Sequence, residues 1–263
     1  AARDPGEKRA LLAELFRHAP EHAGGLAELA RLLPRGANVA PGEARAWLEF
    51  LALGDERPFE LVEPASGDSL GAEQQRLKSE REGWRPDARG FQSERLLVVT
   101  AGARPDAVAR TLRSGELVCD VLEELFRGAR GAAGRLELVL YPTREEYLAH
   151  SGSDLGGLES VLGFTAGHFD LQSEVSRLFL PGEDEESSRL LAVSAHELTH
   201  HWLAVRSPFG APRAEQSTPG FWIVEAIATW VEELELDVER RSWRTRSVRA
   251  PSLDSVRNAR GRA

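Results

Sequence analysis

The spacing of hydrophobic residues is helical over roughly the first fifty positions. Leucine and phenylalanine recur three or four residues apart, as on one face of a helix, in three segments, 7–19, 24–36 and 41–54. The third segment opens with Pro41 and stops at Gly54, as helices often begin and end. The pattern therefore predicts a small helical unit at the N-terminal end.

The next stretch, residues 54–92, is polar and rich in charge, glycine and proline. Within it only residues 59–64 alternate as a strand does, and a charged helix is expected around 72–82. We therefore expect residues 1–90 to form a helical N-terminal region with a charged connector.

From residue 92 onward, strand and helix patterns alternate. Period-two alternation predicts strands at 94–102, 135–142, 161–170 and 174–182, the last two as a hairpin. Helical spacing predicts helices at 105–127, 143–150, 187–206 and 218–236. This mixture indicates an α+β fold with a small mixed sheet, assigned to a domain of residues 91–240. The arginine-rich segment 241–263 has no apolar period, and we expect a solvated basic tail there.

The predicted helix 187–206 contains the sequence HELTH, with His196, Glu197 and His200. Histidines at positions i and i+4 project from the same helix face, one turn apart, so both rings can reach one point. Zinc accepts imidazole nitrogens in a tetrahedral array, and a third protein ligand leaves one corner for water. Glu197 would then lie beside that water and accept its proton.

A helical wheel separates these histidines from the apolar face of the same helix. That face forms one stripe and consists of Leu191, Ala195, Leu198, Trp202 and Val205. Since His196 and His200 fall outside the stripe, we expect them to face a cleft. His201 lies near the edge of the stripe and is expected to be a structural or surface residue.

The following helix places one carboxylate in an otherwise apolar run, FWIVEAIATW. Leaving Glu225 there without a partner would cost several kcal/mol. The loop-like segment 206–218 allows the two helices to fold back on each other. We therefore predict that Glu225 is the third ligand of a zinc ion held by His196 and His200.

Composition narrows the class of protein. The chain has 263 residues, 41% hydrophobic and 29% charged, and a net charge of −9, which argues against nucleic acid as a partner. No apolar run approaches the ~20 residues that cross a bilayer, so no transmembrane segment is expected. The single cysteine, Cys119, is expected to be a buried thiol. Because the chain lacks methionine, we expect a processed N-terminus and an exported protein.

The paired motifs HELTHHWL and GFWIVEAIATWVEE resemble the gluzincin branch of zinc metallopeptidases. The preceding strands, the YPTREEY turn and the Gly-Phe hairpin are similar to those of peptidase MA-like domains of bacterial exported proteins. The resemblance covers about residues 92–237. It implies a zincin-type pair of active-site helices, a zinc cofactor and a peptide or protein substrate.

The resemblance also implies residue roles. His196, His200 and Glu225 would be zinc ligands, and Glu197 the general base. The strand VSRLFLP, residues 175–181, would be the edge strand along which a peptide lies.

Two features depart from the family pattern. Val224 and Ala226 replace the family's Asn and Gly beside the third ligand. The methionine-containing motif that grips a free amino group is absent, which favours an endopeptidase over an aminopeptidase.

Gluzincins usually supply a tyrosine or histidine that shares the oxyanion charge, downstream of the third ligand. No tyrosine or histidine follows His201 in this chain. The candidates lie upstream, and His168 on the hairpin is the best of Tyr141, Tyr147, His150 and His168. A ligand histidine also needs an acceptor for its other ring nitrogen. The candidates are Thr229, Glu232 and Glu233. The two glutamates are, however, expected to be solvated.

Three interpretations stay open at the level of sequence. The first is a zinc-dependent peptide-bond hydrolase. The second is a non-catalytic, zinc-stabilised domain that binds peptides or proteins. The third is a metal-free helical scaffold whose histidines meet by chance.

Overall fold

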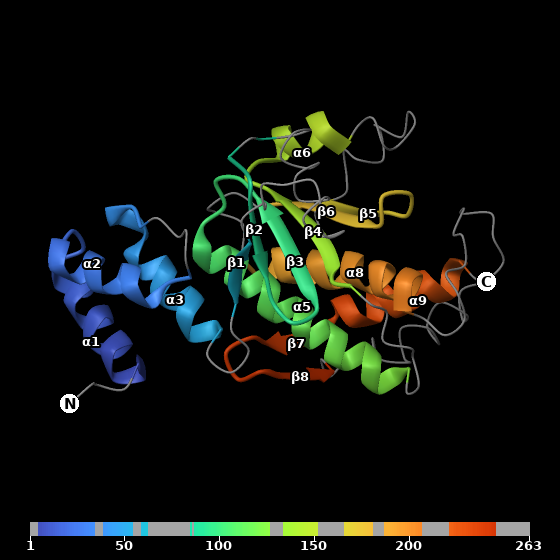
Figure 1. Ribbon diagram of the computed structural model, residues 1–263. Coiled ribbons are helices and arrows are strands. Elements are labelled where there is room, and N and C mark those ends of the chain that lie inside the picture. Colours follow the sequence, from blue (N-terminus) through green and yellow to red (C-terminus); the bar gives the residue numbers. More distant parts are fainter. Residues whose placement is uncertain are drawn as a thin grey trace, which may run out of the picture.

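The computed structural model describes residues 5–34, 39–54, 59–62, 85, 87–126, 134–151, 166–180, 187–206 and 221–245. Its centre is a mixed six-stranded sheet with helices on both faces (Figure 1). In spatial order the strands are β1 (Glu60–Val62), β2 (Arg89–Gln92), β3 (Leu96–Thr100), β4 (Leu136–Tyr141), β6 (Val175–Phe179) and β5 (Gly167–Asp170). Strands β3, β4 and β6 are parallel, whereas β1, β2 and β5 join antiparallel. The predicted mixed α+β fold is confirmed.

The helices divide between the two faces of the sheet. Helices α5 (Pro105–Leu125) and α8 (Ser187–Arg206) cover one face, and α6 (Arg144–Ser151) lies on the other (Figure 1). Side chains alternate along each strand, so Leu96 and Val98 join the core under α5 and α8, while Leu97 and Val99 pack with Tyr147 of α6.

Helix α5 is packed tightly between β3 and α8. Gly115 lies at the crossing, and an added Cβ there would overlap Cδ2 of Leu96 and approach Cδ1 of Leu198 to 3.0 Å. A glycine therefore lets the three elements approach closely.

The N-terminal helices α1 (Pro5–His18), α2 (Ala23–Leu32) and α3 (Ala44–Leu53) share the core of the sheet. Helix α3 packs along α5, and Trp47 and Phe50 contact Phe91 of β2. The Arg110 side chain of α5 also pairs with Glu49 of α3. The helical unit predicted from leucine spacing is present, and its apolar face joins the core of the sheet.

A buried ion pair joins the start of β3 to α5. The Nε of Arg95 donates to Oε2 of Glu116 at 2.7 Å, and Ser93 and the Arg95 backbone donate to Oε1 at 2.6 and 2.8 Å. Burial raises the pKa of Glu116, but these donors and the Arg95 charge outweigh it and hold the pKa below its usual value. Cys119 is buried beside this pair, as expected, and burial raises the pKa of its thiol to about 12.

The end of the described chain differs from its prediction. Helix α9 (Phe221–Glu232) stops before 236, and the strands β7 (Leu234–Asp237) and β8 (Ser242–Thr245) form an antiparallel hairpin. Leu236 pairs with Trp243, and both pack against the main core. Residues 242–245, predicted as the start of a basic tail, are therefore paired as a strand, although all of them except Trp243 are exposed to solvent. In β7, apolar alternation and pairing override the helical propensity of the glutamates. Residues 246–263 lie outside the described residues.

The strand β2 was also missed, since its four residues carry one apolar side chain, Phe91, and owe their conformation to pairing with β1 and β3. The other strands and helices after residue 92 agree with their predictions within a few residues wherever they are described. The exception is β5 (Gly167–Asp170), which occupies only the second half of the predicted strand 161–170. Residues 161–165 lie outside the described residues. Among the described helices, none combines the length and the apolarity needed to cross a membrane.

Candidate metal centre

The candidate metal centre lies between α8 and α9, which pack closely against each other. In α8 the predicted apolar stripe points into the core, with Ala195, Leu198 and Trp202 buried. In α9 the residues Ala228 and Val231 are buried in the same way. This packing turns the HELTH motif of α8 toward the face of α9 that carries Glu225.

Three side chains converge at this point. The Nε2 atoms of His196 and His200 lie 3.1 Å apart. Oε2 of Glu225 is 3.6 Å from the His196 nitrogen, and its Oε1 is 3.4 Å from the His200 nitrogen. The ligand set predicted from spacing is thus brought together in a group able to hold a metal ion.

The separations suit zinc. Ligands at about 2.0–2.1 Å from one ion, at tetrahedral angles, lie about 3.3 Å from each other. The distances of 3.1, 3.4 and 3.6 Å fall on both sides of that value, the last two ending on different oxygens of Glu225. With one ligand atom taken from each residue, all three lie within 4.8 Å of one another. Two imidazole nitrogens and one carboxylate oxygen are also a donor set that zinc accepts, with a fourth position open.

Glu232 holds the other side of the His196 ring. Its Oε2 lies 2.9 Å from Nδ1 of His196, which leaves Nε2 to face Glu225 and His200. A carboxylate on the second nitrogen fixes the tautomer and makes the ring a stronger ligand. The expectation that Glu232 is merely solvated is therefore wrong, while the other two candidates, Thr229 and Glu233, are exposed.

The state of His200 suits a metal ligand. Burial lowers the pKa of His200 to about 4, and the neighbouring His196 ring lowers it too. The imidazole is therefore neutral near pH 7, as a metal ligand must be.

Glu197 lies on the same helix beside the cluster. Burial raises the pKa of Glu197 to about 8, the Glu225 and Glu232 charges raise it further, and a hydrogen bond from the Phe169 backbone lowers it. Phe169 belongs to β5, so the carboxylate is attached to the outermost strand of the sheet. In the metal-free chain this carboxyl group therefore gains and loses its proton near neutral pH.

His201, the residue next to the second ligand, has a packing role. It is buried, its ring stacks on Phe169 with centroids 4.8 Å apart, and its Nδ1 lies 3.3 Å from Oγ of Ser176. These contacts join α8 to β5 and β6 and so fix the height of the HELTH motif above the sheet.

The structure does not bring His168 to the cluster. Phe169 faces α8, so its neighbour on β5 points to the other face of the sheet. There Nδ1 of His168 lies 2.9 Å from the hydroxyl of Tyr147. The remaining candidate donors, Tyr141 and His150, stack on each other on the same α6 side. The role of oxyanion donor predicted for His168 is thus at odds with its position.

The edge strand also needs correction. Residues 175–179 form β6, which is paired with β4 on one side and with β5 on the other. Among the described strands, β5 is the outermost at this end of the sheet. A peptide could therefore add to the sheet at β5 and not at β6.

Phe169 escaped sequence reasoning, and Glu232 was named as a candidate acceptor but expected to be solvated. Glu232 falls on the polar side of an amphipathic helix, where solvated and functional carboxylates look alike, although it lies seven residues, two turns, after Glu225. Phe169 acts through its backbone amide, which leaves no mark in the sequence.

The chain matches no protein-family model, no curated protein and no solved structure.

Proposed function

We propose that the chain is a zinc-dependent peptidase of the gluzincin type, in which His196, His200 and Glu225 hold the ion. The observation that carries the proposal is that one ligand atom from each of the three residues can be chosen so that all lie within 4.8 Å of one another. The two Nε2 atoms are 3.1 Å apart, and each lies 3.4 to 3.6 Å from one of the two Glu225 carboxylate oxygens. The Glu232 carboxylate on the far side of His196 adds support, because a chance meeting of histidines needs no such partner.

A zinc ion held by His196, His200 and Glu225 would supply Lewis acidity, which would lower the pKa of a water molecule toward neutrality and polarise a carbonyl group. Glu197 takes the proton of the attacking water on its carboxylate and returns it to the leaving amine. Its hydrogen bond to the Phe169 backbone keeps the carboxylate at the β5 side of the cluster. His200 stays neutral, and Glu232 keeps the His196 ring oriented.

Strand β5 is where we place the substrate backbone. Its outer side carries no strand among the described residues, and Phe169 on β5 hydrogen-bonds to Glu197. An extended peptide paired with β5 would run past the proposed general base, with main-chain hydrogen bonds providing affinity. Because such pairing does not require a free terminus, it agrees with the endopeptidase preference.

The decisive test compares Glu197→Gln with the unaltered chain. We expect both to contain about one zinc per chain by elemental analysis, and we expect the variant to cleave a peptide library about 10²–10⁴-fold more slowly than the unaltered chain. A chelator should stop cleavage and added zinc should restore it. Undiminished cleavage by the variant would refute the role of Glu197.

One observation favours a second candidate, a non-catalytic zinc-stabilised domain that binds peptides. The upstream tyrosines and His168 lie together on the α6 face of the sheet, so none is placed to share oxyanion charge. This candidate predicts bound zinc and peptide binding without turnover, together with loss of thermal stability on chelation.

A further inference from the structure

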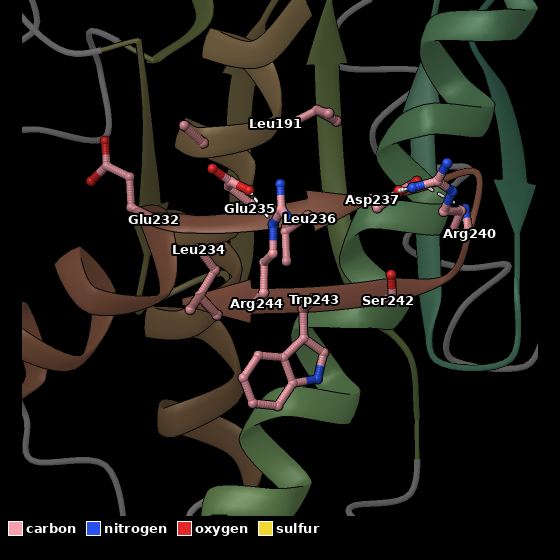
Figure 2. Close-up of a pocket in the computed structure, with 11 residues that line it drawn as sticks. Leu191, Glu232, Leu234, Glu235, Leu236, Asp237, Arg240, Ser242, Trp243 and Arg244 are labelled. Carbon is pink, nitrogen blue, oxygen red and sulfur yellow. Dashed lines mark hydrogen bonds and ion pairs between the residues drawn. The ribbon is translucent and has the colours of Figure 1, made fainter. Parts of the chain in front are cut away.

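A cleft of about 410 Å³ lies between α8 and the β7–β8 hairpin (Figure 2). Its two residues from α8, Leu191 and Ala192, come six and five positions before Glu197, roughly 120–140° around the helix from the proposed general base. The arginines that line the cleft are each paired with a carboxylate of the hairpin. This cleft therefore faces away from the side of α8 where Glu197 meets β5.

The HELTH face of α8, which carries His196, Glu197 and His200, is bounded by two other elements. Glu197 is hydrogen-bonded to the Phe169 backbone of β5, whereas Glu225 approaches both histidines from α9. The HELTH face is therefore a floor with β5 on one side and α9 on the other. A peptide paired with β5 would lie over this floor and would have α9 as its other wall.

Four residues of α9, each three positions apart, show which part of the helix forms that wall. Val231 and Ala228 are buried, Glu225 lies at the metal centre, and Trp222 is exposed. Each step of three turns the side chain by roughly 60° about the helix axis. The series leads from the core, past the metal centre, to the solvent above the HELTH face. Trp222 is therefore the residue of α9 that stands beside Glu225 on the open side.

The exposure of Trp222 is unusual for its residue type. The side chain is 70% exposed, the largest fraction among the exposed large hydrophobic residues of the described chain. Tryptophan is highly buried on average, and exposed apolar surface that adjoins a functional group is typical of a binding site. The indole is large, flat and uncharged, so the partner that suits it is an apolar side chain.

The position of Trp222 along α9 relates it to the peptide bond at the metal. Three residues of a helix rise about 4.5 Å, and long side chains lean toward the N-terminus of their helix. Strand β5 runs roughly alongside α8 and α9 in Figure 1, and an extended peptide advances about 3.4 Å per residue. The indole is therefore level with a substrate residue one or two positions from the bond at the metal centre.

We propose that Trp222 is a specificity-determining residue that binds an aromatic side chain of the peptide, one or two positions from the scissile bond. The inference rests on the proposed peptidase function and names its substrate class. Stacked or edge-to-face aromatic rings gain more than the area they bury, so the indole prefers phenylalanine, tyrosine or tryptophan to an aliphatic side chain. Because Trp222 is not a ligand, its replacement leaves zinc binding unchanged.

NMR titration of the ¹⁵N-labelled chain tests the contact without relying on catalysis. The probes are short alanine peptides, blocked at both ends, with phenylalanine, leucine, arginine or alanine at the centre. Of the six tryptophan indole signals, that of Trp222 is the one missing from Trp222→Ala. We expect the phenylalanine peptide to shift this signal and to bind about fivefold more tightly than the alanine peptide.

The variants separate this site from a general affinity of exposed tryptophan for aromatic rings. Trp222→Ala should remove the phenylalanine preference and keep the zinc content of the unaltered chain. Trp230→Ala is the matched control, because Trp230 is also exposed on α9 but lies roughly 140° around the helix from Glu225. This control should keep the preference.

Cleavage gives a second readout. In an alanine peptide with one central phenylalanine, we expect the cleaved bonds, mapped by mass spectrometry, to lie within two residues of the phenylalanine. The ratio of kcat/KM between this peptide and its all-alanine counterpart should be about fivefold or more. It should fall to about one in Trp222→Ala and stay the same in Trp230→Ala.

Three binding results would overturn the proposal: equal affinity for the phenylalanine and alanine peptides, a phenylalanine preference that survives Trp222→Ala, or one that Trp230→Ala also removes. Tightest binding of the leucine peptide, or of the arginine peptide through a cation–π contact, would assign the indole to another side chain and overturn the aromatic assignment.

The two proposals fail separately. A chain that cleaves no peptide but binds the phenylalanine peptide through Trp222 fails as a peptidase and keeps the aromatic site. A chain that cleaves all the peptides alike, with and without Trp222, keeps the peptidase and loses the aromatic site.

Discussion

Oε2 of Glu232 lies 2.9 Å from Nδ1 of His196, although 36 residues separate them in the chain. This contact ties the last turn of α9 to the motif helix α8. It also means that His196 is held from both sides, by Glu232 at Nδ1 and by Glu225 near Nε2.

The first prediction concerns this contact. Glu232→Ala should reduce zinc affinity about 10- to 100-fold, because the ring loses the acceptor that orients it and increases its basicity. Competition with a chromophoric chelator measures the change, and Glu233→Ala is the matched control. Equal zinc affinity in the two variants would show that the contact has no part in metal binding.

The second prediction concerns pH and Glu197 in chelator-treated, metal-free protein. Because the folded pKa is about 8 and the reference value 4.5, the folded chain holds a proton that the unfolded chain has released. The stability contributed by Glu197 is therefore full below pH 4.5 and is lost as the pH rises through about 8.

Glu197→Gln mimics the protonated form at every pH. Its free energy of unfolding should gain on that of the unaltered chain by on the order of 3 kcal/mol between pH 5 and pH 8. Urea unfolding at both pH values measures the difference. A constant difference across this range would contradict the raised pKa.

The third prediction tests the close approach at Gly115. Gly115→Ala should destabilise the fold by about 1–3 kcal/mol, since the new methyl group overlaps Leu96 and presses on Leu198. Gly42→Ala is the control, because nothing lies within 4 Å of its added Cβ. Thermal or urea unfolding compares them, and a stabilised Gly115→Ala would mean that α5, β3 and α8 are less tightly packed than described.

The fourth prediction concerns the buried pair of Arg95 and Glu116. Glu116→Gln should cost about 1–3 kcal/mol, because it removes the buried carboxylate that pairs with Arg95 and leaves only the more exposed Asp120 and Glu123. The folded pKa of Glu116 is lowered from 4.5, so the stability it contributes is present above pH 4.5 and is lost as the pH falls below it. The deficit of the variant should therefore shrink in acid.

For the acid test, Glu124→Gln on the exposed side of α5 is the control and should stay within about 0.5 kcal/mol at any pH. A deficit of Glu116→Gln that stayed constant down to pH 3 would argue against the lowered pKa.

The sequence predicted the ligand cluster because each part of it follows from local periodicity. Histidines four residues apart must share a helix face, and Glu225 stood out as a carboxylate among apolar neighbours. His168 was harder, because a strand alternates at every residue. Tertiary packing decides which side chains of β5 face α8 and which face the other side of the sheet. Phe169, one residue after His168, is the one that faces α8.

The hairpin after α9 shows another limit of the sequence. The run Glu232 to Glu235 has the composition of a helix, yet Leu234 and Leu236 can pack against the core only if the chain turns into a strand that pairs with 242–245. Such pairing depends on residues 242–245, which the sequence pattern assigns to a polar tail. The same dependence on a distant partner hid β2.

Only Glu233 stands between Glu232 and the first residue of β7. A displacement of the hairpin would therefore be transmitted to the imidazole of His196 through a few covalent bonds and one hydrogen bond. Bending or anchoring the β7–β8 hairpin would therefore change the orientation of the His196 ring, and with it the strength of metal binding.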